Sequence, residues 1–333
     1  MKLAMKLGLA VALALAMVPG ADAQVFSSRL PRTNLFGREY VRLDDWARQQ
    51  GGTARWTIPH QEVKVSLGSG VFAFTVDNRK ATLKGTTVWL SYPVAFKNGS
   101  AYLGASDVVT ALNPIVAPPR NLANRPVRTI VLDPGHGGRD PGNQEGKRQE
   151  KQFTLSFAKE VADSLTKAGF TVSLTRDGDS TLDLPVRTEL ARRRGADLFL
   201  CLHFNSADGP GAATVKGTEV YCMTPVRASS TNARGEGAGA GPYSGNRFDA
   251  KNMLLAFQIQ KAVTEKLGME DRGVKRARFQ VLREAEMPAV LIESAFMTHA
   301  GDAKRIYDPA LRRPLAQAVV DGVLAYKRIV ERK

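Results

Sequence analysis

The chain has 333 residues and carries 47 lysines and arginines against 32 aspartates and glutamates, which gives a formal net charge of +15. A chain of this length accommodates two domains, and its excess of positive charge favours anionic partners. Nucleic acid is not expected to be that partner, because no nucleic-acid-binding motif accompanies the basic residues and the first residues indicate export. An anionic cell envelope fits both features better.

Residues 1–23 have the pattern of a secretory signal peptide. A basic start with Lys2 and Lys6 precedes an apolar run at 7–18, and the Ala-Asp-Ala segment at 21–23 is a typical cleavage site. The alternative is a membrane anchor, but the run is shorter than the roughly 20 apolar residues that a spanning helix requires. We therefore expect an exported protein of the periplasm or the extracellular cell wall that does not span the membrane.

Residues 24–116 are predicted to form a small α+β domain. A short amphipathic helix is expected at 40–47, and alternating apolar and polar residues predict strands at 63–67, 71–74 and 87–90. The segment at 102–109 weakly repeats the pattern of the first helix. Because the unit has no cluster of histidines, cysteines or carboxylates, we predict contact with the envelope or the substrate rather than catalysis.

A linker at 117–127 that contains proline and asparagine leads to a second domain at 128–333. There, apolar strands alternate with amphipathic helices, which is typical of an α/β fold with a mostly parallel sheet and helices on both faces. The expected strands are 129–132, 171–175, 197–202, 218–223, 279–282 and 289–292, and the expected helices are 150–168, 184–194, 252–267 and 310–330.

Four chemically suitable side chains are expected at one edge of this sheet. His136 follows the first strand, and Glu150 begins the helix after it. His203 and Glu293 end two other strands. In open α/β sheets the functional site lies outside the carboxyl ends of the strands, so the four should converge. The glycines around His136 let the backbone turn tightly and leave room for a ligand.

Two histidines and a carboxylate are typical ligands of a catalytic zinc ion, whose fourth position is left open for water. A second carboxylate supplies the base that this water needs. The sequence therefore predicts a zinc hydrolase with one Zn²⁺. Asp133, Asp140 and Glu145 compete with Glu150 for the role of carboxylate ligand, and Glu150 is preferred because the start of a helix is a rigid mount.

At these motifs the chain resembles the zinc-dependent N-acetylmuramoyl-L-alanine amidases of the type-3 amidase family. The matching segments are residues 131–138, Glu150 and Lys151 with Leu155, residues 174–177, Leu184 with Arg187, residues 196–199 leading to His203 and Asn205, and residues 288–293. The resemblance implies that His136, Glu150 and His203 hold zinc and that Glu293 is the catalytic carboxylate. It also implies the substrate, the amide between N-acetylmuramic acid and L-alanine of the peptidoglycan stem.

The chain departs from the family pattern at a few positions, none of which is a predicted ligand or base, so the departures concern the selectivity of the pocket. Ala295 replaces a glycine after the Glu-Ser pair, an asparagine is missing near Thr298, and Cys201 and Leu202 precede the second histidine. The first domain resembles, more weakly, the N-terminal module of copper amine oxidases that is found in secreted proteins. That resemblance implies no copper here.

Two other functions remain open. A zinc carboxypeptidase acting on wall peptides shares the ligand set and the base, but it needs an arginine to clamp a free carboxylate, and Arg176, Arg187 or Arg283 could serve. A non-catalytic peptidoglycan-binding protein belongs to a different class, but a binder has no use for a complete ligand set plus a base. Regulatory partners are not indicated by the sequence.

Two further features leave alternatives. Cys201 and Cys222 fall in expected strands, where export permits a disulfide but buried thiols that simply pack are favoured. The segment 227–246 is rich in glycine and small polar residues. A passive loop is the favoured interpretation. The preceding strand 218–223 is expected to run parallel to its neighbours, so that the segment emerges at the zinc-bearing edge, and the alternative hypothesis is a mobile lid.

Overall fold

A computed structural model describes residues 30–122, 125–231 and 241–332 of the protein. The predicted signal peptide at 1–23 and the centre of the predicted loop at 227–246 lie outside these residues. None of the described helices is long and apolar enough to cross a membrane.

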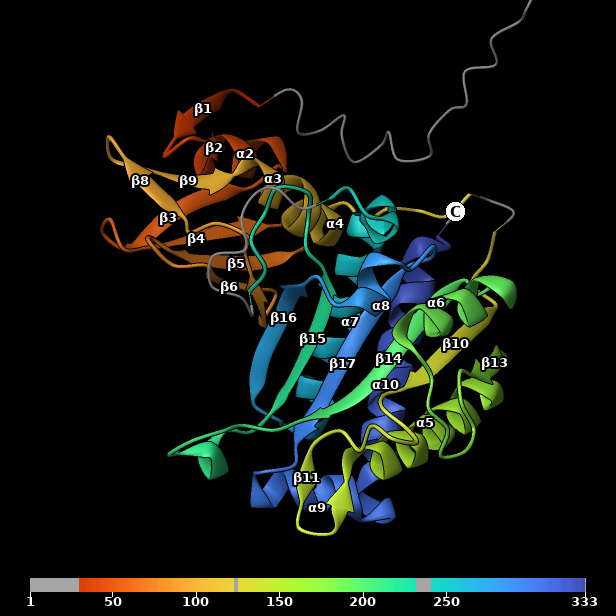
Figure 1. Cartoon of the computed structure of the whole chain (residues 1–333). Helices are drawn as coiled ribbons and strands as arrows, with labels where there is room; N and C mark the ends of the chain where they lie inside the picture. Colours follow the sequence, from red (N-terminus) through yellow and green to blue (C-terminus); the bar gives the residue numbers. More distant parts are fainter. Residues whose placement is uncertain (1–29, 123–124, 232–240, 333) are drawn as a thin grey trace, which may run out of the picture.

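Eleven strands form one large sheet with the order β13-β10-β14-β17-β15-β16-β7-β6-β5-β4-β3 (Figure 1). Strands β10 (Thr129–Pro134), β13 (Thr171–Leu174), β14 (Leu198–Asn205) and β17 (Ala289–Phe296) are parallel neighbours, as the sequence predicts. Their inner side chains alternate between two apolar clusters: Ile130 and Leu132 face one, and Val131 faces the other. The predicted α/β fold with helices on both faces is confirmed.

Helices on each face cover these clusters. One face packs against α5 (Glu150–Lys167), α7 (Asp249–Leu267) and α10 (Pro309–Val330), and the other against α6 (Leu184–Arg193) and α8 (Gln280–Arg283). Shorter elements complete the domain. They are β11 (Gln144–Glu145), β12 (Arg148–Gln149), η2 (Ala212–Thr214), η3 (Ser244–Phe248) and α9 (Ala300–Tyr307).

The predicted direction of one strand is wrong. Strand β15 (Thr218–Met223) pairs antiparallel with β17, with Glu219 opposite Glu293. The reason is the connection from β14, because residues 206–217 contain only a short 3₁₀ turn. A parallel neighbour needs a longer crossover, usually a helix, to return the chain to the starting edge. The chain therefore enters β15 at the edge where β14 ends.

This reversal overturns the basis of the lid hypothesis. The segment after β15 leaves the sheet at the edge opposite to the one where β14 and β17 end. Its described part packs on the N-terminal unit, where Tyr92 Oη donates a 2.8 Å hydrogen bond to the Arg227 carbonyl and Ala228 is buried. Residues 232–240 lie outside the described part of the chain.

The strand predicted at 279–282 is also wrong. Those residues form α8, and the strand is β16 (Asp271–Ala277), which runs parallel to β15. Sequence patterning missed β16 because three of its side chains are basic. They lie in the sheet with polar partners: Arg272 and Lys275 bind the Glu219 carboxylate, and Arg276 binds backbone carbonyls.

The N-terminal unit is a small α+β structure, as predicted. One antiparallel sheet contains β1 (Arg32–Leu35), β2 (Arg38–Arg42), β9 (Ser100–Gly104) and β8 (Ala95–Lys97). The other strands are β3 (Thr53–Ile58), β4 (Glu62–Leu67), β5 (Gly70–Thr75), β6 (Lys80–Leu83) and β7 (Thr86–Trp89). The helical segments are α2 (Leu43–Gln49), α3 (Ala105–Asp107), η1 (Val108–Leu112) and α4 (Asn113–Val116). The repeated sequence pattern corresponds to a strand leading into a helix, β2–α2 and β9–α3.

Strands of the N-terminal unit continue the large sheet beside β16 (Figure 1). Thr87 N donates to the Asp271 carboxylate at 2.6 Å, and the Trp89 indole donates to the Arg272 carbonyl at 2.9 Å. The fully buried Arg276 guanidinium donates to the Thr110 carbonyl at 2.7 Å. The two units thus share one sheet and one apolar core. The division of the chain by a linker at 117–127 stays a prediction.

Candidate active site

The loop after β10 places His136 at the carboxyl edge of the parallel strands. His136 has a left-handed backbone conformation with φ of +61°, which is uncommon for a residue other than glycine and is often found at functional sites. Gly135 lets the His203 ring approach the backbone of this loop closely, because a Cβ at position 135 would lie 2.2 Å from Cε1 of His203. Position 142 also has no room for a side chain, since a Cβ there would lie 2.6 Å from the His136 ring and 2.7 Å from Glu150 Oε2.

Two buried arginines hold this loop in place. Arg187 Nη1 donates to the Asp133 carboxylate at 2.9 Å, and its Nη2 donates to the His136 carbonyl at 2.9 Å. Arg176 Nη2 donates to the Gly135 carbonyl at 2.7 Å. Buried backbone carbonyls require such partners. Both guanidinium groups are therefore occupied by the protein itself.

Three of the four predicted side chains form a compact cluster. Each of His136, Glu150 and His203 offers a potential ligand atom, and these atoms lie within 4.8 Å of one another. Glu150 Oε2 is 3.0 Å from His136 Nε2, and its Oε1 is 2.9 Å from His203 Nδ1. The two imidazole rings are nearly perpendicular, with centroids 4.8 Å apart.

The Glu150 carboxylate is 1% exposed and is held by the surrounding backbone. Asn143 donates to Oε2 from its backbone N and its Nδ2, both at 2.9 Å, and Phe204 N donates to Oε1 at 3.1 Å. Burial alone would raise the pKa of Glu150, but hydrogen bonds with His136 and His203 hold it well below its usual range. The carboxylate is therefore ionised at neutral pH, which is the form that binds a cation.

Asp140 orients His136 rather than joining the cluster. Its Oδ2 accepts a 2.7 Å hydrogen bond from His136 Nδ1, which leaves Nε2 facing Glu150. A carboxylate on the far nitrogen of a histidine is the usual outer partner at a metal site. The other two competing carboxylates are elsewhere: Asp133 is fully buried against Arg187, and Glu145 lies in the β11–β12 hairpin.

Glu293 lies beside this cluster. It is paired in register with His203, and both residues lie within their strands rather than at the ends, because β14 and β17 extend further than predicted. Its Oε2 is buried without a hydrogen-bond partner. Burial, followed by the charges of Glu150 and Glu219, raises the pKa of Glu293 well above its usual range. An unpartnered carboxyl group with a raised pKa is typical of a proton-transferring residue.

The sequence did not indicate a second carboxylate, Glu219. This residue lies on β15 directly opposite Glu293 of β17, and it is 2% exposed. Arg272 Nε donates to it at 2.9 Å and Asn205 Nδ2 at 3.0 Å, and Lys275 forms an ion pair with it. The sequence around Glu219 did not mark it as part of the site, because its basic partners Arg272 and Lys275 lie on β16, the strand that was not predicted. Asn143, which supports Glu150, was missed for a different reason, because it lies in a loop and loop residues carry no periodicity.

The remaining predicted residues have structural roles or lie elsewhere. Arg283 lies on α8, before the amino end of β17, and its guanidinium is 5.3 Å from the centre of the Tyr243 ring. Ala295 is fully buried in the core. Cys201 and Cys222 are buried, unbonded thiols, and Cys201 Sγ donates to the Asp133 carboxylate at 3.1 Å. None of these side chains completes the cluster.

The donor set fits a zinc ion. Two imidazole nitrogens and one ionised carboxylate oxygen, with a carboxylate behind one imidazole, match the composition of three-ligand zinc sites. These features define an α/β protein with a candidate mononuclear metal site at the carboxyl edge of its parallel strands. Residues 130–325 match the family model described as N-acetylmuramoyl-L-alanine amidase, and the chain belongs to this family.

Known proteins with similar sequences carry the same description. The amidase AmiC of Neisseria meningitidis serogroup B is 34% identical over 259 residues, which cover 70% of this chain and 61% of that protein. LytC of Bacillus subtilis is 35% identical over 200 residues, covering 60% and 36%. The chain therefore spans less than two thirds of these two relatives. The solved structure of AmiC2 from Nostoc punctiforme has a TM-score of 0.50 and 31% identity, and the match covers 60% of this chain and 96% of that one.

Proposed function

We propose that the protein hydrolyses the amide bond between N-acetylmuramic acid and L-alanine in peptidoglycan. The observation that carries this proposal is the unpartnered Glu293 carboxyl group beside the cluster of His136, Glu150 and His203. Family membership supports the reaction class, and the names of the similar proteins support the substrate.

In this proposal, His136 Nε2, His203 Nδ1 and a Glu150 oxygen hold one zinc ion. Zinc at such a site lowers the pKa of water and polarises the scissile carbonyl. The Asp140 carboxylate fixes the His136 tautomer by accepting from Nδ1, so that Nε2 is free as a ligand. Asn143 holds the Glu150 carboxylate in place with two hydrogen bonds.

Glu293 is the general base and then the general acid. It takes a proton from the attacking water, whose hydroxyl group adds to the lactyl carbonyl carbon. It then returns that proton to the alanine nitrogen as the carbon–nitrogen bond breaks. Burial raises the pKa of Glu293, which makes its carboxylate a stronger base towards the attacking water. The products are a free lactyl carboxylate and a stem peptide with a free amino terminus.

The occupied arginines weigh against the carboxypeptidase alternative. That reaction needs a cation near the site to clamp a terminal carboxylate. Arg176 and Arg187 are committed to the His136 loop, and Arg283 lies on α8, before the amino end of β17 and away from the edge that carries the cluster. A purely wall-binding role leaves the buried, unpartnered Glu293 oxygen unexplained, since such a group is costly to bury.

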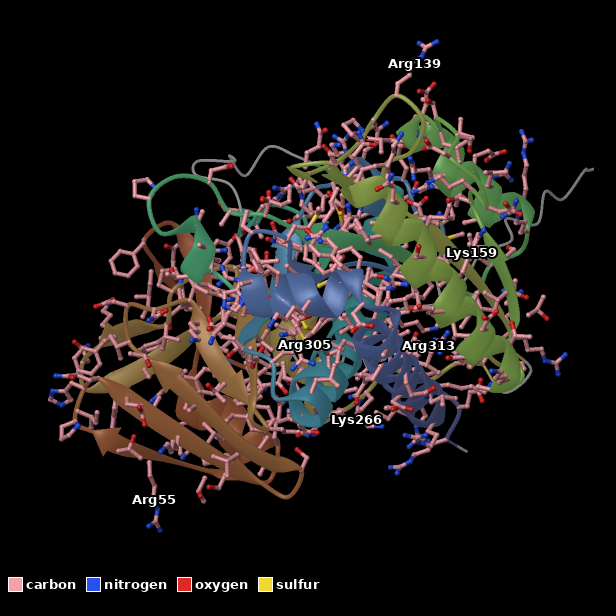
Figure 2. The ribbon with its side chains drawn as sticks, turned by 90° about the horizontal axis from the view of Figure 1, so that it is seen from below. Arg55, Arg139, Lys159, Lys266, Arg305 and Arg313 are labelled. Atoms are coloured by element: carbon pink, nitrogen blue, oxygen red, sulfur yellow. The ribbon has the colours of Figure 1, made fainter. Side chains whose placement is uncertain are left out.

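We further infer that the protein acts outside the cytoplasm, in the periplasm or the cell wall, with residues 24–116 contacting the envelope or the substrate. The basic surface supports this inference, and Figure 2 shows cationic side chains projecting from both units, such as Arg55 and Arg139. Dye release from purified sacculi, with and without a zinc chelator, tests the proposed activity. Release that continues in excess chelator would contradict the zinc assignment, and absence of release would contradict the reaction.

A further inference from the structure

An open concavity of about 590 Å³ lies between the β12 strand and the helices α9 and α10, at the sheet edge that carries the candidate active site (Figure 1). Its lining includes Arg148 on β12, two residues before Glu150, and Lys304 and Tyr307 on α9, the helix that follows β17. Figure 1 shows α9 next to the β11 hairpin at the edge of the sheet where β14 and β17 end. A ligand in the active site could therefore extend into this concavity.

Arg148 is held in a fixed orientation there. Its guanidinium carbon lies 4.2 Å from the centre of the Tyr307 ring, and that ring packs on Phe153 of α5 with centroids 4.6 Å apart. Among the described residues, no carboxylate forms an ion pair with Arg148 or Lys304. The N–H donors of a guanidinium lie in one plane, and stacking on the ring fixes the orientation of that plane, which suits recognition of a carboxylate.

The lining carries two cations and is partly apolar, and Glu145, a described residue that lies opposite Arg148 in the β11–β12 hairpin, forms no ion pair with it. The single acidic side chain that lines the concavity, Asp308, caps α10 by accepting a 2.8 Å hydrogen bond from Ala310 N. Leu311 is 41% exposed and adds an apolar patch. Two cations over an apolar lining fit a short aliphatic side chain that ends in a carboxylate.

The walls are rigidly connected. Arg312, which is buried, forms a bidentate pair with Glu160 of α5 at 3.0 and 2.9 Å, and its Nη1 donates to the Ile306 carbonyl at 2.7 Å. These bonds tie the end of α9 and the start of α10 to α5. A preformed cationic surface loses little conformational entropy when it binds an anion.

We propose that this concavity is a subsite for a free carboxylate of the peptidoglycan stem peptide, at a residue beyond L-alanine. The inference rests on the proposed amidase function and assigns Arg148 and Lys304 a positioning role in substrate binding. Neither residue touches the reacting amide, so their loss should change KM rather than kcat.

The test compares two soluble substrates, N-acetylmuramoyl tripeptides with either free stem carboxylates or the corresponding carboxamides. Arg148→Met keeps the aliphatic contact with Tyr307 but removes the charge. We expect this variant to raise KM roughly tenfold for the free-acid substrate, with unchanged kcat and an unchanged KM for the carboxamide. Lys304→Met should act in the same direction with a smaller effect, because an ammonium lacks the planar fork of donors.

Lys159→Met is the matched control, because it removes an exposed cation from α5 that does not line the concavity. It should leave both KM values unchanged. An Arg148→Met variant that alters KM equally for both substrates, or for neither, would overturn the subsite while leaving the amidase proposal intact. Wild-type protein that cleaves neither substrate would overturn the proposed function and the subsite together.

Discussion

Replacing Asp140 by asparagine tests how His136 is prepared for a metal. The Asp140 carboxylate accepts from His136 Nδ1 at 2.7 Å and is the only partner of that ring nitrogen among the described residues. Loss of such an outer partner typically weakens metal binding about 10- to 100-fold. Because the Asp140 side chain is 61% exposed, solvent screens part of its charge, and we expect the lower end, about tenfold.

The measurement is a zinc titration in competition with a chromophoric chelator. Asp179→Asn is a close control, because Asp179 accepts from Gly138 N of the same loop at 2.7 Å and its side chain is 59% exposed, but it does not contact His136. The control should bind zinc as the wild type does. Unchanged zinc affinity in Asp140→Asn would refute the orienting role. A loss of more than about a thousandfold would show that Asp140 is itself a ligand.

His136→Ala and Glu150→Ala should each lose zinc by metal analysis, since the remaining ligands are too few; full occupancy in the Glu150 variant would move the ligand role to another carboxylate. Deleting residues 1–116 should lower the urea midpoint, because it uncovers the edge of β16 and removes the Thr110 carbonyl from the buried Arg276; an equal midpoint would show that the shared sheet adds no stability. Desolvation raises the pKa of Asp249 to about 7, above its value of about 3.9 in the unfolded chain. Between these two values the folded state keeps a proton that the unfolded state loses. The free energy of unfolding therefore falls as the pH rises from about 4 to 7. The urea midpoint of Asp249→Asn should therefore match the wild type near pH 4 and exceed it near pH 8, and parallel pH profiles would contradict the assignment.

The positions of the candidate ligands could be predicted because they depend only on topology. His136, His203 and Glu150 follow or begin elements with strong hydrophobic periodicity, and parallel strands bring their carboxyl ends to one edge. The structure accordingly groups these three side chains. Glu293 was predictable for the same reason, since its strand is a continuous apolar run.

Features that depend on partners distant in sequence could not be predicted. The direction of β15 follows from the short, non-helical connection before it, and the basic strand β16 is stabilised by Glu219 and by the N-terminal unit. The function of Arg176 and Arg187 as supports of the His136 loop likewise appears only when the carbonyls they bind are located. Apolar periodicity carries no information about such polar contacts.

In the proposed function, Glu293 transfers the proton during hydrolysis of the muramoyl–alanine amide at this site. The most direct measurement is mass spectrometry of the products that wild type and Glu293→Gln form from a soluble muropeptide, with zinc content determined on the same samples. We predict free N-acetylmuramic acid and an intact stem peptide from the wild type, and a turnover reduced at least about 100-fold in a variant that retains its zinc. Release of single amino acids from the carboxyl terminus, or a zinc-loaded variant that keeps more than about a tenth of the wild-type rate, would contradict the account.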